Sequence, residues 1–452
     1  MRDLFSRRLF AAGIAAAVSF VGAGTAHAAG FAIYEQGTTG LGNAFAGAAA
    51  VAEDPTTIFW NPAGMTHLEG GQAAGSGFVI TPHGEFTNNG SRNCPTPVLC
   101  APPGLGPIGG NDGRDGAVAA FVGAFYYSQQ LTDELWLGVG MSSPFGLVTD
   151  YDPDWVGRYH GIHSELLTIN LNPSLAYKVT DWLSIGIGAN IQYAYASFTS
   201  AVDTGAPGAP GAADSFLHVD GADFGFGGNV GVLIEPVEGT RLGVHYRSEL
   251  EQNLSGTSVL SVNPLIPVIG GGTFTGTATA SVTLPDTVAI SLFHQLTDDV
   301  ALLGDATWTQ WSDVPALVIN IAGLPAGNGP AVTMLNWEDT WRFSAGVIWD
   351  ATDDLSLRLG YAFDQSPVPS ATFRTPRVPD NDRHWATVGG TYAVDDGIDL
   401  TLAYAHLFVG DTPIANNDPS AFPHFLIGNF DASVDIFSFQ LTVDSDALGN
   451  LF

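Results

Sequence analysis

Apolar residues recur at every second position in segments of ten to sixteen residues, from about residue 72 to near the end of the chain. In the clearest segment, residues 183–195, Ile185, Ile187 and Ile191 lie on one face, and Ser184 and Gln192 lie on the other. A period of two is that of a β-strand whose two faces meet different surroundings. One face suits lipid and the other suits a polar lumen, although a soluble β-sandwich would alternate in the same way.

The connections between these segments are alternately short and long. Six short acidic turns are at 132–134, 180–181, 235–239, 297–299, 351–354 and 395–397. Seven long loops are near 87–116, 148–163, 199–223, 256–272, 312–337, 366–382 and 410–431. Outer-membrane barrels have tight turns on the periplasmic side and longer loops outside. The pattern therefore predicts an all-β fold, a transmembrane antiparallel barrel of about fourteen strands over residues 72–452.

The first 28 residues have the pattern of a cleavable signal peptide. Arg7 and Arg8 precede an apolar run at 9–21, and small residues follow at Ala26 and Ala28. The run is too short for a membrane-spanning helix, which needs about 20 residues. We expect a mature chain that begins at Ala29 and is exported to the outer membrane of a Gram-negative bacterium; an uncleaved anchor helix is the alternative.

Residues 29–71 do not alternate, are rich in Gly and Ala, and precede the first strand. Fourteen strands enclose a lumen that is too wide for wall side chains alone to fill. These residues are therefore predicted to form a plug inside the barrel. The alternative, a periplasmic extension, would leave Ile58, Phe59 and Trp60 in water.

The chain carries 14 Lys and Arg against 45 Asp and Glu, a net charge of −31. Nucleic-acid binding, which needs clustered cations, is excluded. The acidic residues are expected in solvated loops and turns, where divalent cations are a hypothetical partner. Cys94 and Cys100 are the only cysteines, and in an oxidising compartment we expect them to form a local disulfide.

No pattern of catalytic residues stands out. Asp150, Asp152 and Asp154 begin a calcium-loop spacing, but Trp155 stands where that loop needs Gly. No glycine-flanked nucleophilic Ser is found, and two lone thiols are too few for a closed zinc site. We expect no enzyme activity, no metal and no cofactor; an outer-membrane lipid hydrolase or a structural barrel is the alternative.

Short motifs lie along nearly the whole predicted mature chain. They are Ala29-Gly30-Phe31, Gly40-Leu41-Gly42-Asn43-Ala44-Phe45-Ala46-Gly47, Ala52-Glu53-Asp54, Asn61-Pro62-Ala63-Gly64, Pro144-Phe145-Gly146-Leu147, Trp155-Val156-Gly157-Arg158-Tyr159, Gly304-Asp305-Ala306-Thr307-Trp308, Ser366-Pro367-Val368-Pro369 and Arg374-Thr375-Pro376-Arg377-Val378-Pro379-Asp380. Together they resemble the FadL-type family of outer-membrane transporters for long-chain fatty acids and other hydrophobic compounds. The Asn-Pro-Ala element is the most specific of them.

The resemblance implies a fourteen-strand barrel with a hatch in its lumen, formed by the predicted plug. It also implies passive transport, in which extracellular loops capture a hydrophobic ligand, an internal pocket holds it, and it leaves sideways through the wall. Outer-membrane lipid, lipopolysaccharide and the outer-membrane assembly machinery are then the expected partners of a monomer. A general diffusion porin is a further alternative.

The family's wall opening lies at an inward kink in its third strand, which corresponds here to residues 135–147. This strand contains Gly138, Gly140, Pro144 and Gly146, with Phe145 between the last two. Pro cannot donate a ladder hydrogen bond and Gly weakens a strand. We predict the lateral gate here; an ordinary irregularity at the strand end is the alternative.

Within the plug, Asn61, Pro62 and Ala63 are predicted to form a tight structure, because an Asn side chain bonds its own backbone and the residue before Pro is held extended. It would brace the plug against the wall beside the gate, or form a simple turn. By resemblance, Ala29, Gly30 and Phe31 reach into the ligand pocket.

A fatty-acid carboxylate in an apolar lumen would need a cation or several donors. The candidate cations are Arg158, Arg247 and Arg358. For each of them the alternative is a lumen salt bridge, for example with Glu249, Asp305 or Asp364. Because cations are so few, a neutral hydrophobic substrate stays open.

Overall fold

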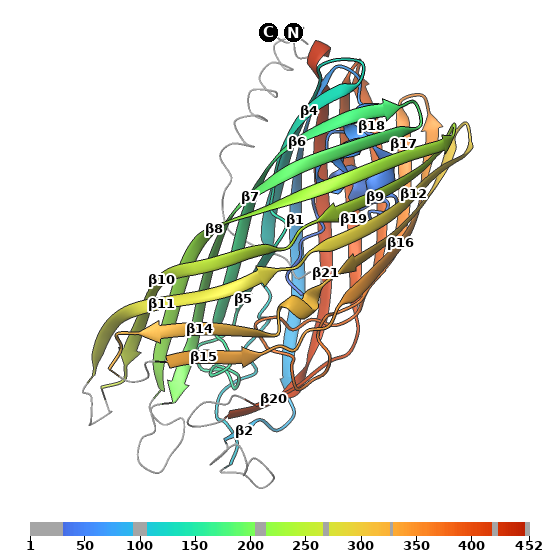
Figure 1. Cartoon of the computed structure of the whole chain (residues 1–452). Coiled ribbons are helices and arrows are strands. Elements are labelled where there is room, and N and C mark those ends of the chain that lie inside the picture. Colours follow the sequence, from blue (N-terminus) through green and yellow to red (C-terminus); the bar gives the residue numbers. More distant parts are fainter. Residues whose placement is uncertain are drawn as a thin grey trace, which may run out of the picture.

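The computed structural model describes residues 30–93, 106–203, 214–264, 271–325, 329–417 and 424–447. Their main feature is a closed antiparallel barrel of 14 strands, as predicted (Figure 1). Strand β1 (Gly71–Asn88) closes it by pairing with both β3 (Ala120–Gln130) and β21 (His424–Asp444). The predicted signal peptide, Ala29 and the predicted disulfide Cys94–Cys100 lie outside the described residues.

The wall strands follow one another around the barrel in chain order. Between β3 and β21 they are β4 (Leu135–Ser142), β6 (His163–Thr180), β7 (Leu183–Asp203), β8 (Asp214–Val237), β9 (Thr240–Arg247), β12 (Thr287–Thr297), β13 (Val300–Thr309), β16 (Thr340–Thr352), β17 (Leu355–Asp364), β18 (Arg383–Asp395) and β19 (Ile398–Val409). All six predicted short turns join neighbouring strands of this series.

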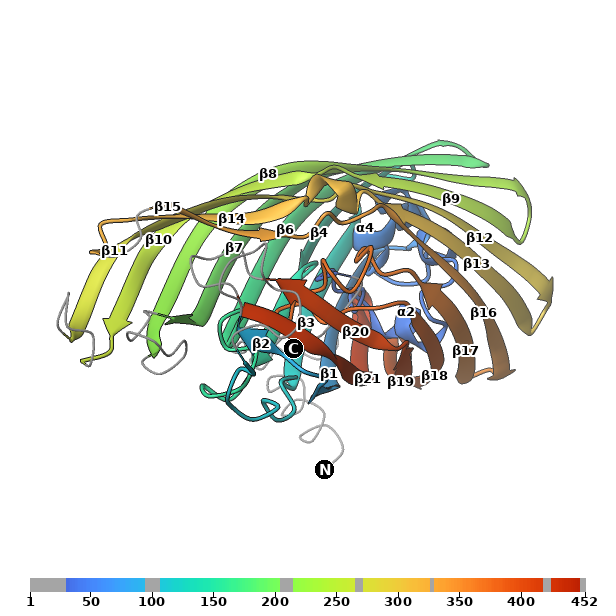
Figure 2. The same ribbon diagram turned by 90° about the horizontal axis from the view of Figure 1, so that it is seen from below.

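The long loops are shorter than predicted, because strands of the sheet extend into the predicted loop regions. The additional strands are β2 (Arg92–Asn93), β5 (Gly146–Asp150), β10 (Leu250–Val262), β11 (Gly272–Leu284), β14 (Ala316–Ala322), β15 (Gly329–Met334) and β20 (Thr412–Asn417). Figure 2 shows β10, β11, β14 and β15 extending away to one side of the barrel. The Gly-, Ser- and Thr-rich sequences of β10 and β11 obscure the alternation, although the backbone ladder persists.

The alternation predicted from the sequence corresponds to lipid and lumen faces. On β7, Ile185 and Ile187 are 42% and 57% exposed on the outer surface, whereas Ser184, Asn190 and Gln192 are buried inside. No described helix is both long and apolar enough to cross a membrane. The apolar outer surface of the strands is the surface that suits lipid.

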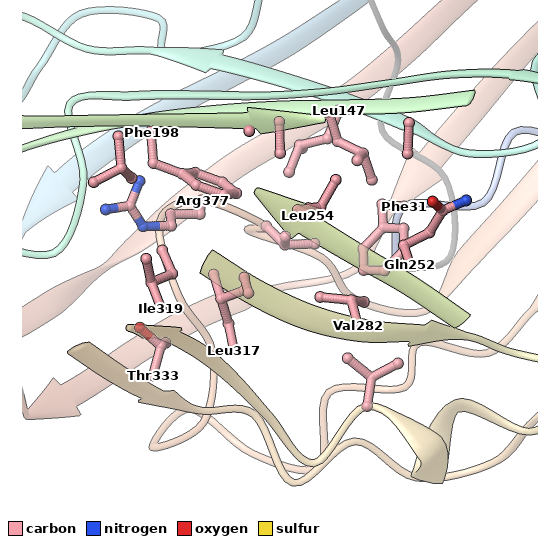
Figure 3. Close-up of a pocket in the computed structure, with 18 of the residues that line it drawn as sticks. Phe31, Leu147, Phe198, Gln252, Leu254, Val282, Leu317, Ile319, Thr333 and Arg377 are labelled. Atoms are coloured by element: carbon pink, nitrogen blue, oxygen red, sulfur yellow. The ribbon is translucent and has the colours of Figure 1, made fainter. Parts of the chain in front are cut away.

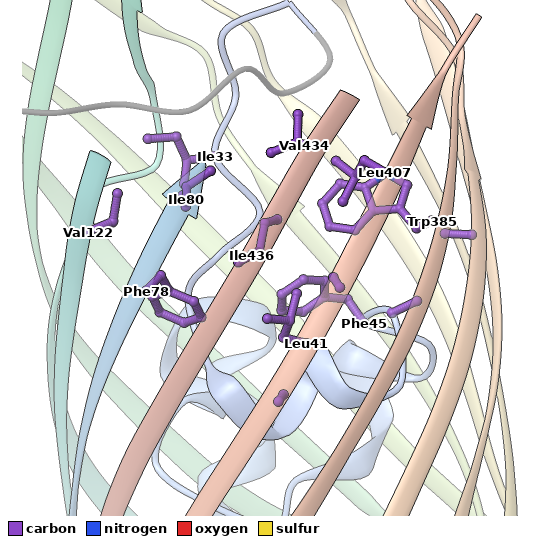
Figure 4. Packing of buried hydrophobic residues seen from close by; sticks show 14 of the residues in the cluster. Ile33, Leu41, Phe45, Phe78, Ile80, Val122, Trp385, Leu407, Val434 and Ile436 are labelled. Carbon is purple, nitrogen blue, oxygen red and sulfur yellow. The ribbon is translucent and has the colours of Figure 1, made fainter. Parts of the chain in front are cut away.

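Residues 30–70, which we call the plug, lie inside the barrel, nearer the end that carries the short turns (Figure 1). They contain α2 (Thr38–Gly42), α3 (Ala48–Val51), α4 (Thr57–Trp60) and the 3-10 helix η1 (Pro62–His67). Leu41 and Phe45 are fully buried in a cluster with Trp385 of β18 and Leu407 of β19 (Figure 4).

Glycines on the inner face of the wall let the plug backbone approach closely. A Cβ added at Gly231 would overlap Asn61 Oδ1, and one at Gly243 would overlap the carbonyl oxygen of Ala49. A Cβ at Gly360 would likewise overlap the backbone of Asn43. Some of the many strand glycines therefore allow the plug backbone to contact the wall directly.

Candidate functional site

An apolar cavity of about 100 Å³ lies between Phe31 of the plug and the strands that extend to one side of the barrel (Figure 3). Its walls come from β5, β6, β7, β8, β10, β11, β14, β15 and the loops beside them. The apolar lining includes Leu147, Leu166, Ala194, Ala196, Phe198, Val219, Leu254, Val282, Leu284 and Leu317. Phe31 of the plug also lines it, so the plug and the wall enclose the same space.

Two of the polar residues that line the cavity, Arg377 and Gln252, lie at opposite ends of it; Asp220, Thr279, Thr333 and Thr375 also line it. At one end the Arg377 guanidinium lies 5.1 Å from the Phe198 ring centroid, and its Nη1 donates to Ser164 Oγ at 2.9 Å. Gln252 lies at the other end, beside Phe31 (Figure 3). The sequence analysis assigned no role to Arg377, because strand periodicity cannot show that the loop after β17 folds into the lumen.

Aromatic side chains hold Phe31 in place. Its ring centroid lies 6.0 Å from that of Phe145, 5.0 Å from that of Trp311 and 5.4 Å from that of Trp337. The preceding residue, Gly30, has φ +61° and donates its N–H to Asp380 Oδ2 at 3.1 Å. Phe31 therefore lies at the cavity, and Gly30 is bound to the loop that follows β17.

The third wall strand is interrupted between β4 and β5. Residues 143–145 leave the ladder, and the plug pairs with them: Ile33 N–H donates to the Pro144 carbonyl at 2.8 Å, and Gly146 N–H donates to the Phe31 carbonyl at 2.9 Å. On the other side, the Thr168 hydroxyl donates to the Phe145 carbonyl at 2.6 Å. The N-terminal end of the plug thus acts as a short strand at the interruption.

Next to this interruption, part of β3 is not paired with the neighbouring residues 142–148 in the described chain. Pairing between β3 and β4 ends at Phe125 and Met141, and it returns only at an isolated bridge between Ala117 and Thr149. None of the pairings within the described chain joins residues 118–124 to residues 142–148. Ile33 packs in the same cluster as Ile80 and Val122 of the neighbouring strands (Figure 4), so it covers the opening from inside.

The predicted gate residues divide into two groups. Pro144 and Phe145 lie in the interruption, and Gly146 begins β5. Gly138 and Gly140, assigned to the same kink from the sequence, are instead paired regularly with β3 and β6. Their lack of a side chain has a different consequence: a Cβ at Gly138 would collide with Met65 and Ile58 of the plug.

The Asn-Pro-Ala element contacts β7 and β8, which lie beyond β6 from the interrupted strand. Asn61 Nδ2 donates to the carbonyls of Ala49 at 2.7 Å and Val232 at 3.1 Å, and Asn61 Oδ1 accepts from Ala63 N–H at 3.1 Å. Ala63 lies against Gly186 of β7. The contacts with β4 come from neighbouring plug residues, Ile58 and Met65.

The three candidate arginines have different partners. Arg158 pairs with Asp214 at 2.6 Å, and Arg358 pairs with Glu53 at 2.8 Å, so each of these two forms a salt bridge in this structure. Arg247 Nη1 instead donates to Asn190 Oδ1 at 2.6 Å, and its Nη2 donates to the Phe59 carbonyl at 3.0 Å. All three side chains are buried.

Glu35 is a buried carboxyl group that the sequence analysis did not single out. It is 1% exposed, and its Oε2 has no hydrogen-bond partner within the described part of the chain. Burial raises the pKa of Glu35 to about 7, although Arg383 and Arg342 act in the opposite direction. The next residue, Gln36, donates from its Nε2 to the Ser143 carbonyl at 2.8 Å. No group of three potential metal ligands gathers anywhere in the described ranges.

Comparisons with known proteins agree with this geometry. A family model described as "Outer membrane protein transport protein (OMPP1/FadL/TodX)" matches residues 19–444. Outer membrane protein P1 of Haemophilus influenzae is 30% identical over 418 residues, which cover 87% of this chain and 88% of that protein. The long-chain fatty acid transport protein of Escherichia coli K12 is 27% identical over 432 residues, covering 88% and 91%.

The fold is also that of a solved structure. A crystal structure of a Pseudomonas aeruginosa FadL homologue superimposes with a TM-score of 0.81 at 24% identity, covering 92% of this chain and all of that one. A structure of the Pseudomonas putida toluene transporter TodX gives a TM-score of 0.69 at 16% identity, covering 92% of this chain and all of that one. At these identities the likeness concerns the fold.

Proposed function

Because the chain belongs to the OMPP1/FadL/TodX family of outer-membrane transport proteins, we propose that it carries long-chain fatty acids or similar hydrophobic molecules through its apolar cavity and out through the barrel wall. The observation that carries the proposal is the position of Phe31. It lines the cavity, and its backbone pairs with the interrupted strand. Transport is passive, since the ligand moves from water into lipid.

The size of the cavity limits how a long ligand can bind. A cavity of about 150 Å³ is known to hold one benzene molecule. The present space of about 100 Å³ is smaller than that, so a long alkyl chain either extends beyond it or requires a lining side chain to move. Phe31 is the lining residue on the plug, and no wall strand has to break for it to move.

Withdrawal of Phe31 would also remove part of the cover over the wall opening. The carbonyl of Phe31 accepts from Gly146, and two residues later Ile33 donates to Pro144. When this short strand leaves, the gap between residues 118–124 and 142–148 is exposed to the lumen. A hydrophobic molecule then leaves sideways into outer-membrane lipid and avoids the lipopolysaccharide head groups.

The test is uptake of radiolabelled hexadecanoate by cells that lack their own transporter, with and without this gene. Ala196, buried on β7, lines the cavity, and an Ala196→Trp variant fills it. We expect uptake with the wild-type gene. In the variant we expect uptake to fall by about tenfold or more, because the indole occupies the space that the ligand needs.

The matched control is Ile187→Trp, which places the same side chain on the lipid face of the same strand. It should retain wild-type uptake at equal surface expression. Absence of uptake by the wild type would overturn the fatty-acid proposal, and equal uptake by the Ala196→Trp variant would overturn the route through the cavity. Swelling of liposomes in small sugars by the wild type would point to a porin instead.

A further inference from the structure

Arg247 differs from Arg158 and Arg358 in having only neutral polar partners within the described residues. Its guanidinium is bound by the Asn190 side chain and the Phe59 carbonyl, and it lies 4.3 Å from the Phe59 ring centroid. The carboxylates that might have paired with it are elsewhere: Glu249 is exposed, and Asp364 pairs with Arg383. A buried guanidinium without a counter-ion is costly, so an anion that binds beside Arg247 would be stabilised by it.

A row of buried amide side chains connects Arg247 to the apolar cavity. Asn190, its partner, is followed two residues later on the same face of β7 by Gln192. Gln252, which lines the cavity, lies with its Nε2 3.4 Å from the Gln192 carbonyl. The cavity, Gln252, Gln192, Asn190 and Arg247 are therefore consecutive neighbours.

Two of these amides have unused hydrogen-bonding atoms. Gln192 is 2% exposed and its Nε2 donor has no partner in the described structure; the same holds for Oε1 of Gln252, also 2% exposed. Buried polar atoms of this kind are normally satisfied by protein, water or ligand. An unused donor between a cation and an apolar cavity is a suitable partner for a carboxylate.

We infer that Arg247 and Gln192 form a head-group site for the carboxylate of an amphiphilic ligand whose hydrocarbon chain occupies the apolar cavity. This inference rests on the proposed function and names its substrate class as monocarboxylates with a long apolar chain. A carboxylate here competes with the Phe59 carbonyl of α4 for Arg247, and so replaces one contact between the plug and the wall.

The test compares two ligands of equal chain length, hexadecanoate and the uncharged hexadecan-1-ol, binding to the full-length protein in lipid nanodiscs. An Arg247→Met variant removes the charge but keeps an unbranched side chain. We expect it to weaken hexadecanoate binding by about tenfold or more, as for loss of a charged hydrogen bond, and to change hexadecanol binding less than twofold.

The matched control is Arg241→Met, six residues earlier on the same face of β9, where the guanidinium lies 4.1 Å from the Phe293 ring centroid. It should leave the affinities for both ligands unchanged. If Arg247→Met fails to form a barrel, Arg247→Lys, which retains the charge, and Gln192→Leu, which removes the unused donor, take its place. Lysine should retain carboxylate binding, and leucine should weaken it selectively.

The outcomes separate the two proposals. If the wild type binds neither ligand, the proposed function is wrong. If it binds both and Arg247→Met binds hexadecanoate as well as the wild type does, the proposed function stands and the head-group site is overturned. Equal loss of both ligands in Arg247→Met, or an equal loss of hexadecanoate in Arg241→Met, also overturns it.

Discussion

The two ends of the plug contact the wall in different ways. At the Asn-Pro-Ala end, a buried Asn61 amide bonds the Val232 carbonyl of an intact strand, and wall glycines let the backbones touch. At the N-terminal end, Ile33 and Phe31 bond an interrupted strand through their backbones. The first end fits one complementary surface of the wall, whereas the second supplies hydrogen bonds that a neighbouring strand would otherwise make.

This difference indicates which end can move. Close packing tolerates little displacement, because adding or shifting even a few atoms costs contacts. At the N-terminal end, water or a rearranged wall can replace the backbone hydrogen bonds, and a hydrophobic ligand can replace the apolar contacts of Phe31. We therefore interpret the Asn-Pro-Ala end as the anchor of the plug and residues 30–36 as its mobile end.

Gly231→Val should have the largest effect, because it disrupts the contact that anchors the plug. The new side chain would overlap Asn61 Oδ1, so Asn61 must give up its bond to Val232. We expect a loss of about 1–3 kcal/mol of stability, as for overpacking, and a plug that no longer seals the lumen. Thermal unfolding and liposome swelling in small sugars measure the two effects.

Gly304→Val is the control, since a Cβ at Gly304 meets no atom within 4 Å. It should unfold at the wild-type temperature and give no swelling. A Gly231→Val variant that is as stable and as tight as this control would show that the anchor is not where we place it.

The double substitution Pro144→Val with Gly146→Val tests the mobile end of the plug. Valine favours strands, and valine at position 144 restores a backbone N–H donor, so the third strand can extend toward β3 without the plug. We expect a several-fold drop in hexadecanoate uptake with normal stability. Met141→Val, a lipid-facing change in the intact part of β4, is the control and should transport normally. Unchanged uptake in the double variant would mean that the ligand leaves elsewhere.

Strand number and topology could be predicted because they are local properties. Each strand shows lipid and lumen faces in its own sequence, as at Ile187 and Gln192, and each turn has its own acidic residues. The site depends on contacts between distant segments. Nothing around Arg377 shows that its loop enters the lumen beside Phe198, and nothing around Gly146 shows that Phe31 pairs with it.

The plug illustrates the same limit within a single motif. The cap made by Asn61 on Ala63 follows from the Asn-Pro-Ala sequence itself, and the structure contains it. Its attachment to β7 and β8 depends on Gly186 and Gly231, which read in the sequence as ordinary strand glycines. Only the spatial approach distinguishes them from glycines such as Gly304, which face open space.

Glu35 offers the mildest test of the mobile end, through pH. Its carboxyl group has a pKa raised by burial from 4.5 to about 7, so the closed plug prefers the protonated form. If a ligand displaces residues 30–36, Glu35 becomes hydrated and its pKa returns toward 4.5. The closed state is then favoured fully below pH 4.5, and this advantage is lost as the pH rises through about 7.

Binding of hexadecan-1-ol, which does not titrate in this range, reads out that balance without a charge on the ligand. We expect the wild type to bind it more weakly at pH 4.5 than at pH 7.5, and Glu35→Gln to show a smaller pH dependence. Burial also raises the pKa of Asp380, the partner of Gly30, so any residual slope should disappear in a Glu35→Gln, Asp380→Asn double variant. Glu238→Gln, in the β8–β9 turn, should behave as wild type. A wild-type slope in Glu35→Gln, or tighter binding in acid, would mean that ligand entry does not expose Glu35 and that this end of the plug stays in place.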